Sequence, residues 1–345
     1  MKHRPKLFAV LFFAVCALAF QTKSLPASDL AEAISQMKAQ IESDAVPAGP
    51  FRADVAVCDQ RRHKILILKA GEDWSKPESV VWEWSAAMSP QIRPEHHSWF
   101  RNPDECKPAR GTSHLLMTAS GGGIALIRLA DKACLFYSRI EGNPHSIELL
   151  PDGNIASVSS GGLFTLWAVP EGNDAVDENT RLAPNPKGRQ YPLVGGHGMV
   201  WDDEMQILWV LGYKELAGYE YNFNKKDPAL TKAFSISVDK TFADGGHDLY
   251  PVPDQRAFFL TGRGIGIYDI EKKEFISLVS KETHPKGMHS VKSVSQSPEG
   301  YLIIQSPTTN YWSPRIPFFN QKLSPIGTLP DGMIYKARWW VEKWK

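Results

Sequence analysis

One pattern recurs four times in the chain: a histidine, about five strand-forming residues, a turn, and a second strand-forming run. The copies start at His145, His197, His247 and His289, at successive intervals of 52, 50 and 42 residues. A third apolar run usually follows, as at 265–270, and a fourth is visible in some copies, as at 274–279. Four short antiparallel strands in a repeat of about 40–50 residues are typical of a β-propeller blade.

Two further copies lack the histidine. One covers 106–140, and the other begins at Ala53 and contains only the second, third and fourth strands. We expect the C-terminal segment 332–340 to supply its missing first strand, so that the two ends of the chain share a blade and leave no long exposed edge. The sequence therefore predicts an all-β, six-bladed propeller. Seven blades is the alternative, because 169–191 and 305–329 are long enough to contain irregular strands.

The N-terminal part is predicted to lie outside the propeller. Basic residues precede the apolar run Leu7–Phe20, which is shorter than the roughly 20 residues of a membrane span and reads as a signal peptide. We expect residues 1–19 to be removed, with cleavage as late as 27 as an alternative, and the protein to be periplasmic or secreted. Residues 20–50 form a leader with one peripheral helix over 29–43, where apolar residues recur at helical spacing. The propeller domain covers 51–345.

Composition restricts the partners. Removal of 1–19 takes away three Lys or Arg and no acidic residue, so the net charge changes from +1 to −2. That balance does not suit a nucleic-acid-binding protein, and no second long apolar segment predicts membrane insertion. We expect a monomer. Cys58, Cys106 and Cys134 remain, which allows one disulfide and one free thiol but gives no zinc-finger spacing.

Propeller topology predicts where the histidines lie. The first strand of each blade lines the central channel, and the chain enters it on the same face as the loop between strands two and three. His145, His197, His247 and His289 should therefore surround one mouth of the channel. Lys107 and either Lys336 or Arg338 are expected near the equivalent positions of two other blades. The loops between strands two and three bring further polar and aromatic candidates to that rim: Gln60, Arg61, Arg62, Arg263 and Tyr311.

The converging imidazoles have three interpretations. Four of them could bind Zn²⁺, Mn²⁺ or Ca²⁺, and one of them could transfer a proton near neutral pH. In the structural interpretation, each histidine instead bonds to an aspartate of its own blade, as in WD-type propellers, where a Gly-His pair also precedes the inner strand. The pairs Gly196-His197 and Gly246-His247 fit that pattern, but acidic residues are scarce in the turns between strands two and three.

Several segments resemble a known family. They are "CDQRRHKILIL", "CKPARG", "ASGGGIALI", "HSIELLPDGNIASVSS", "GGHDL" and "VKSVS". They are similar to an uncharacterised family of exported bacterial propellers associated with polysaccharide degradation, which implies a carbohydrate-related function. A looser resemblance is to oligogalacturonate-lyase-type propellers, in which mouth histidines hold a metal ion that binds a uronate carboxylate.

These observations lead to one main hypothesis. The chain is expected to act on an acidic oligosaccharide at the histidine mouth, by a metal-assisted β-elimination in which His197, His247 or Lys107 removes a proton. The metal ligands would be His145, His197, His247 and His289. The substrate would be bound by Gln60, Arg61, Arg62, Arg263, Tyr311 and Lys336. The alternatives are a non-catalytic module that binds a glycan or peptide, and a glycoside hydrolase or isomerase.

Overall fold

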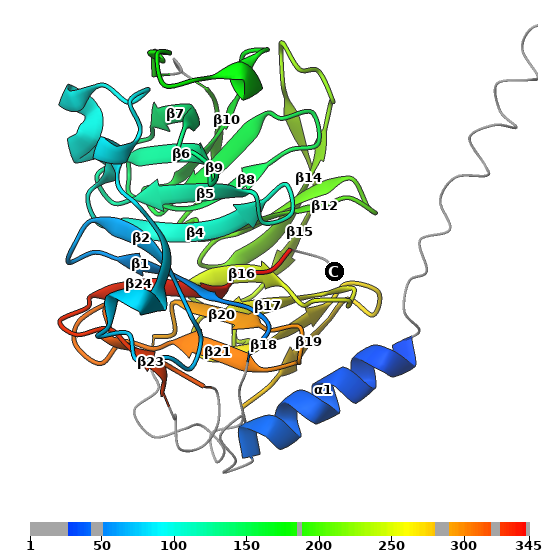
Figure 1. The fold of residues 1–345 in the computed structure, drawn as a ribbon. Coiled ribbons are helices and arrows are strands. Elements are labelled where there is room, and N and C mark those ends of the chain that lie inside the picture. The colour runs from blue at the N-terminus through cyan, green and yellow to red at the C-terminus, as the bar shows by residue number, and fades with distance from the viewer. Residues whose placement is uncertain (1–26, 43–50, 185–187, 280–289, 319–324, 343–345) are drawn as a thin grey trace, which may run out of the picture.

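The computed structural model describes residues 27–42, 51–184, 188–279, 290–318 and 325–342, and these form an all-β propeller with one α-helix (Figure 1). Five antiparallel four-stranded sheets form blades A to E, written from the inner strand outward. Blade A contains β24 (Ile334–Trp339), β1 (Val55–Asp59), β2 (Lys64–Leu68) and β3 (Val80–Trp84). Blade B contains β4 (Pro103–Ala109), β5 (His114–Ala119), β6 (Gly123–Arg128) and β7 (Cys134–Arg139), and blade C contains β8 (Pro144–Leu149), β9 (Ile155–Ser159), β10 (Leu163–Trp167) and β11 (Arg189–Pro192). Blade D contains β12 (Gly198–Asp202), β13 (Ile207–Leu211), β14 (Glu215–Tyr221) and β15 (Leu230–Ser237), and blade E contains β16 (Asp248–Pro251), β17 (Ala257–Thr261), β18 (Ile265–Asp269) and β19 (Glu274–Ser277).

The predictions of six and of seven blades are wrong, because the described residues form only five four-stranded blades. The remaining strands make two separate pairs, β20 (Ser293–Gln296) with β21 (Leu302–Gln305) and β22 (Arg315–Pro317) with β23 (Pro325–Thr328). A single bridge between Ile303 and Phe318 joins the two pairs. Pro307 and Pro314 lie between β21 and β22, and since proline has no N–H to donate to a ladder, they interrupt strand pairing there.

The expected closure of the ring is confirmed. β24 pairs antiparallel with β1, with Val55 opposite Trp339, and the two strands lie side by side although they come from opposite ends of the chain (Figure 1). The inner strands contact one another in the order β24, β4, β8, β12, β16, β20 and back to β24. We call the end of the channel where these strands begin the upper end, and the end where they finish the lower end.

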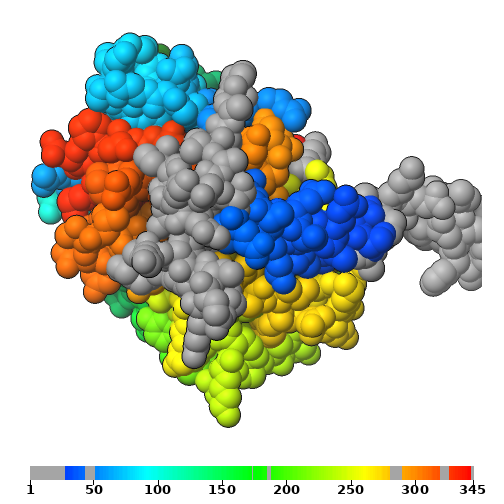
Figure 2. All heavy atoms as spheres, turned by 90° about the horizontal axis from the view of Figure 1, so that it is seen from below, coloured from blue at the N-terminus to red at the C-terminus, as the bar shows by residue number. Residues whose placement is uncertain are grey.

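The predicted peripheral helix is also present, as α1 (Ala27–Glu42). Its buried residues, Leu30, Ile34, Met37 and Ile41, share one core with β17, β18, β20 and β21, so the helix lies against blade E and the β20–β21 pair (Figure 2). Gln40 Oε1 accepts a hydrogen bond of 3.1 Å from the N–H of Leu302 at the start of β21. Burial of large apolar side chains is worth roughly 1.5–3 kcal/mol each, so this face stabilises the most irregular part of the ring.

Cys58, Cys106 and Cys134 are buried free thiols. The predicted signal peptide lies outside the described residues. Within the described part of the chain, no helix is both long and apolar enough to cross a membrane. Short 3₁₀ helices complete the connections: η1 (Pro77–Ser79), η2 (Ala86–Met88), η3 (Pro94–Phe100) and η4 (Asn173–Ala175).

Candidate functional site

Three of the four predicted histidines come together at the upper end of the channel. The rings of His145 and His197 are stacked with centroids 4.2 Å apart and planes 10° apart, and the His247 ring lies 5.1 Å from that of His197. Each residue stands at the start of an inner strand, so the topology of the blades alone brings them together. The fourth, His289, lies outside the described residues.

Lys292 occupies the position that was expected for the fourth histidine. The N–H groups of His197, His247 and Lys292 each donate to the last residue of the adjacent second strand, at 2.9, 2.8 and 2.8 Å. Each of the three residues directly precedes its inner strand, so Lys292 is their equivalent before β20. The repeat aligned on His289 is therefore displaced by three residues from the position that the strands define. The segment "SVSQ" of β20, in which polar residues flank a valine, is the signal that marks the inner strand. We call His145, His197, His247 and Lys292 the upper mouth.

The Lys292 ammonium group is buried without an anionic partner. The side chain is only 4% exposed, and its Nζ lies 5.6 and 6.0 Å from the ring centroids of Tyr311 and Tyr335. Among the described residues no carboxylate lies within ion-pair distance of it. Burial, and then the nearby charge of Lys336, lower the pKa of Lys292 to about 8. The group is therefore mostly protonated at neutral pH, at a cost that a bound anion would relieve.

The histidines of the upper mouth are neutral. Burial is the main cause that lowers the pKa of His197 to about 3 and that of His247 to about 4. Burial and the neighbouring His197 put the pKa of His145 well below its ordinary value. The buried Nδ1 of His247 has no hydrogen-bond partner among the described residues, although the Gly245 carbonyl acts to raise its pKa. These rings can exchange hydrogen bonds with a ligand, while Lys292 supplies the positive charge.

The stacking of the His145 and His197 rings does not suit a metal ion shared by the two. The lone pairs of an imidazole lie in its ring plane, so two nearly parallel rings direct them along parallel planes, whereas a tetrahedral metal site requires them to converge. Among the described residues, no group of three or more His, Cys, Asp or Glu side chains is placed to hold a metal ion. The four-histidine metal site includes His289 and therefore stays a prediction.

The structural interpretation of the histidines predicts bonds to aspartates, and within the described part of the chain none is found. His197 Nδ1 lies 2.9 Å from the carbonyl oxygen of Gly195 in its own loop, and His145 Nε2 lies 3.1 Å from Asn143 Nδ2. Gly195 has φ of +64°, and a Cβ there would collide with the ring of Tyr213, which stacks on His197 at 5.3 Å. Glycine at this position therefore lets the Tyr213 ring lie against His197.

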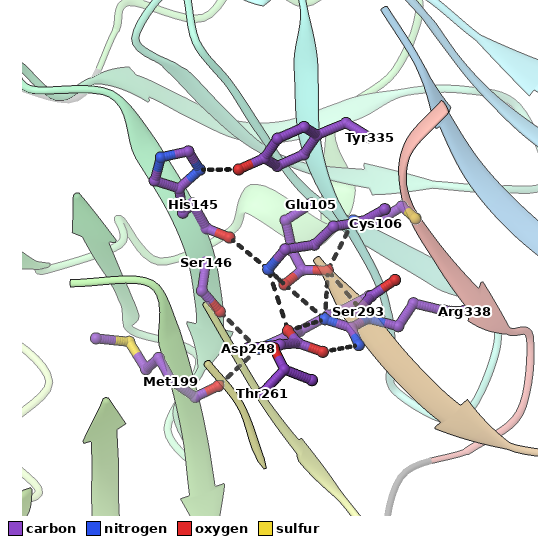
Figure 3. Close-up of polar contacts among 12 residues, drawn as sticks. Glu105, Cys106, His145, Ser146, Met199, Asp248, Thr261, Ser293, Tyr335 and Arg338 are labelled. Carbon is purple, nitrogen blue, oxygen red and sulfur yellow. Dashed lines mark hydrogen bonds and ion pairs between the residues drawn. The ribbon is translucent and has the colours of Figure 1, made fainter. Parts of the chain in front are cut away.

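A network of buried ion pairs fills the channel below the upper mouth (Figure 3). Arg338 Nη2 lies 3.1 Å from Glu105 Oε2 and 2.6 Å from Asp248 Oδ1, and Lys336 Nζ lies 3.2 and 3.1 Å from the same two carboxylates. Burial alone would raise the pKa of Glu105, but Arg338 and Lys336 outweigh it and lower that pKa. We call Glu105, Lys107, Glu148, Asp248, Lys336 and Arg338 the channel plug.

Lys107 and Lys336 therefore do not lie at the rim. Lys107 is fully buried, and its Nζ donates to Ser146 Oγ at 2.8 Å and to the Met199 carbonyl at 2.5 Å. Lys336 connects the plug to the upper mouth by donating to the His145 carbonyl at 3.2 Å. β4 begins four residues before Lys107 and β24 two residues before Lys336, so both strands carry these side chains into the channel. Neither residue is placed to reach a ligand at the upper mouth.

The predicted rim cations are at the upper end, but aspartates already pair with two of them. Arg62 Nη1 lies 2.6 Å from Asp59 Oδ2, and Arg263 Nη2 lies 3.0 Å from Asp244 Oδ2. The Arg263 side chain is nevertheless 75% exposed and can reorient toward a ligand. Arg61 is exposed on the turn between β1 and β2.

Gln60 and Tyr311 have different roles. Tyr311 is 60% exposed beside Lys292, where a sugar ring could stack on it. Gln60 is buried: its Oε1 accepts from Trp312 Nε1 at 2.5 Å, and its Nε2 donates to Asp104 Oδ1 at 2.8 Å. Burial raises the pKa of Asp104 well above its ordinary value. Asp104 was not among the predicted site residues, although it stands beside Glu105 and near Lys107 in the segment "DECK".

The chain can be compared with known proteins. A family model described as a family of unknown function, DUF6528, matches residues 11–344. No curated protein matches the chain.

Similar solved structures add evidence on the fold alone. A crystal structure of a protein of unknown function from Bacteroides caccae matches with a TM-score of 0.51 and 12% identity, over 83% of this chain and 98% of that chain. A putative 6-phosphogluconolactonase from Bacteroides fragilis matches with a TM-score of 0.46 and 13% identity, over 74% and 72% of the two chains, which is too weak for a functional argument. The expected links to export and polysaccharide degradation stay predictions.

Proposed function

The chain belongs to DUF6528, a family of unknown function, and we propose that its upper mouth binds a carboxylate-bearing ligand, with an acidic oligosaccharide as the best candidate. The observation that carries the proposal is Lys292, a 4% exposed ammonium group with no carboxylate within ion-pair distance among the described residues. A buried cation is costly unless it is paired. A ligand carboxylate at this position would supply the missing pair.

The surroundings of Lys292 suit a sugar acid. Neutral imidazoles can donate to or accept from hydroxyl groups. The side chains of Tyr213 and Tyr311 are 39% and 60% exposed at the upper end, and exposed aromatic rings commonly mark binding surfaces. Because the channel plug lies directly below, a ligand would approach from the upper end and rest on the histidines without passing through the channel.

Binding is better supported than β-elimination. Elimination requires a base to remove the proton on the carbon next to the carboxylate while the bond to the leaving sugar oxygen breaks, a double bond forms and that oxygen gains a proton. With pKa values of about 3 and 4, His197 and His247 are weak bases for this step. Lys107 is enclosed in the plug, and Lys292 would gain a proton more readily, not lose one, beside a carboxylate. A lyase activity is the second candidate.

The test compares oligogalacturonates with their methyl esters, which keep the sugar rings and remove the charge. Calorimetry should show binding of the free acid to the wild type, with affinity lower by at least about tenfold for the ester and for Lys292→Met. The control Lys76→Met removes an exposed lysine before η1 and should bind as the wild type does. Equal binding of acid and ester, or equal loss in both variants, would overturn the proposal.

Two further readouts separate the related hypotheses. Binding should survive treatment with a chelator. If it is lost and returns on addition of Zn²⁺, Mn²⁺ or Ca²⁺, the metal interpretation replaces the one based on Lys292. Ultraviolet absorbance from an unsaturated sugar product during incubation would establish the lyase in place of a module that only binds.

A further inference from the structure

A cavity opens at the lower end of blades B, C and D. Its volume is about 580 Å³, and it is lined by the turns that follow β4, β8 and β12 and by the segment after β10. His145 stands at the upper start of β8, whereas Glu148, near the lower end of the same strand, lines this cavity. The size is within the range of small-molecule sites, roughly 300–1,000 Å³. The channel plug separates it from the upper mouth.

The lower cavity is acidic, in contrast to the upper mouth. Two cationic side chains, Arg110 and Lys225, line it together with six carboxylates: Glu148, Asp152, Glu171, Asp174, Asp203 and Glu342. Arg110 Nη1 lies 2.6 Å from Asp174 Oδ1. Glu148, which is 3% exposed, lies 3.6 Å from Lys107 Nζ of the plug. Even after these pairs, negative charge exceeds positive charge around the cavity.

Two of the other carboxylates, Asp152 and Asp203, accept hydrogen bonds from uncharged donors. Asp152 Oδ2 accepts from Tyr221 Oη at 2.6 Å and from Asn154 Nδ2 at 3.2 Å, and its Oδ1 accepts from the Asn154 N–H at 3.1 Å. Asp203 Oδ1 accepts from Trp201 Nε1 at 2.6 Å. These donors orient the two carboxylates and bring no balancing positive charge.

The walls indicate which kind of cation fits. Among the described residues, no three His, Cys, Asp or Glu side chains are placed to hold a metal ion, so the carboxylates are too dispersed for a small inorganic ion. Apolar residues, including Leu126, Val169 and Trp201, also line the cavity. An aromatic ring flanked by carboxylates attracts an organic ammonium group, and methylene groups pack against apolar walls.

We propose that the lower cavity binds an organic polycation, a linear polyamine in its chemistry, whose amino groups pair with the dispersed carboxylates while its methylenes contact the apolar walls. The upper mouth and the lower cavity would then bind ligands of opposite charge on opposite faces of one propeller. The proposal does not depend on the function of the upper mouth.

Calorimetric titration of the full chain with spermidine at physiological ionic strength tests the proposal. We expect one saturable site, and no binding of 1,5-pentanediol, which has methylenes but no charge. Glu171→Gln with Asp203→Asn should weaken spermidine binding on the order of tenfold. The matched control is Glu271→Gln with Glu274→Gln, which removes two exposed charges from blade E and should leave binding unchanged.

Three outcomes would overturn the proposal: no saturable binding of spermidine, equal weakening in the two double variants, or equal binding of the diol. Absence of binding would mean that the cavity takes no polyamine. Equal weakening in the two double variants would indicate diffuse charge attraction, and equal binding of the diol would indicate an apolar site. Lys292→Met should bind spermidine as the wild type does. Failure of the upper-mouth proposal can therefore be told apart from failure here.

Discussion

Replacing Lys292 with methionine should stabilise the protein while removing the proposed anion-binding group. Burial lowers the pKa of Lys292 from 10.5 to about 8. Each tenfold change in a proton-binding constant is worth about 1.4 kcal/mol, so holding this ammonium group inside the fold costs about 3 kcal/mol at neutral pH. Methionine fills a similar volume and has no charge to desolvate, so Lys292→Met should recover most of that free energy.

The pH dependence has a definite sign. Between about pH 8 and 10.5 the unfolded chain binds more protons at this lysine than the folded chain, so the free energy of unfolding of the wild type should rise with pH. The cost is fully present below pH 8 and absent above 10.5. Lys292→Met lacks this contribution. The difference between variant and wild type should therefore be about 3 kcal/mol at pH 7 and should shrink toward zero near pH 10.5.

Urea unfolding of the wild type, Lys292→Met and Lys76→Met at several pH values measures this difference. Lys76→Met should follow the wild type at every pH, because its side chain is exposed. If Lys292→Met is no more stable than the wild type at pH 7, or if its advantage does not change with pH, then Lys292 is not an unpaired buried cation and the basis of the upper-mouth proposal is wrong.

Four further predictions concern the rest of the molecule. Arg338→Met should lower the free energy of unfolding by about 3–5 kcal/mol, since it leaves the buried carboxylates of Glu105 and Asp248 with too little positive charge. Arg189→Met removes an exposed pair and should cost under about 1 kcal/mol. Similar losses of the two variants in urea unfolding would contradict a stabilising role of the channel plug. Because burial raises the pKa of Asp104, the free energy of unfolding of the wild type should fall as the pH rises above about 3.8 toward that raised pKa. Asp104→Asn should lose less stability between pH 4 and 7. If the free energies of unfolding of the two proteins change in parallel with pH, Asp104 is charged in the folded protein. Cys58, Cys106 and Cys134 should all be unreactive in the native protein and all react in denaturant; reaction of only one of the three after unfolding would reveal a disulfide. Tyr311→Ala should weaken oligogalacturonate binding several-fold without changing stability, because its ring is 60% exposed, and unchanged affinity would remove it from the site.

The blades could be predicted because each is a local unit. Its strands follow one another along the chain, so apolar runs and turn residues mark them in order. The shared blade was also predictable, since a set of strands lacking its first member implies a partner elsewhere. The β20–β23 region was not, because its prolines interrupt the four-strand pattern and, among the described residues, one bridge between Ile303 and Phe318 joins its two strand pairs.

The site was only partly predictable. The upper location of His145, His197 and His247 follows from topology, but Lys292 was missed because the repeat was aligned on residue type and not on strand position. Glu105, Asp248 and Arg338 come from three different inner strands, so their pairing exists only after the ring closes. Charged residues at alternate positions of otherwise buried strands, as in "DECK" and "YKAR", were the available signal. The lower cavity is formed by turns from several blades, and no single segment encodes it.

The position of β24 has a consequence for biosynthesis. A ribosome makes the strand that carries Lys336 and Arg338 after all the other strands, yet this strand lies innermost in blade A. Until it arrives, Glu105 and Asp248 lack the two cations that pair with them in the folded protein. Docking of β24 thus supplies both cations and closes the ring in one step, so a chain cut short before Ile334 should lack both and be cleaved readily by proteases.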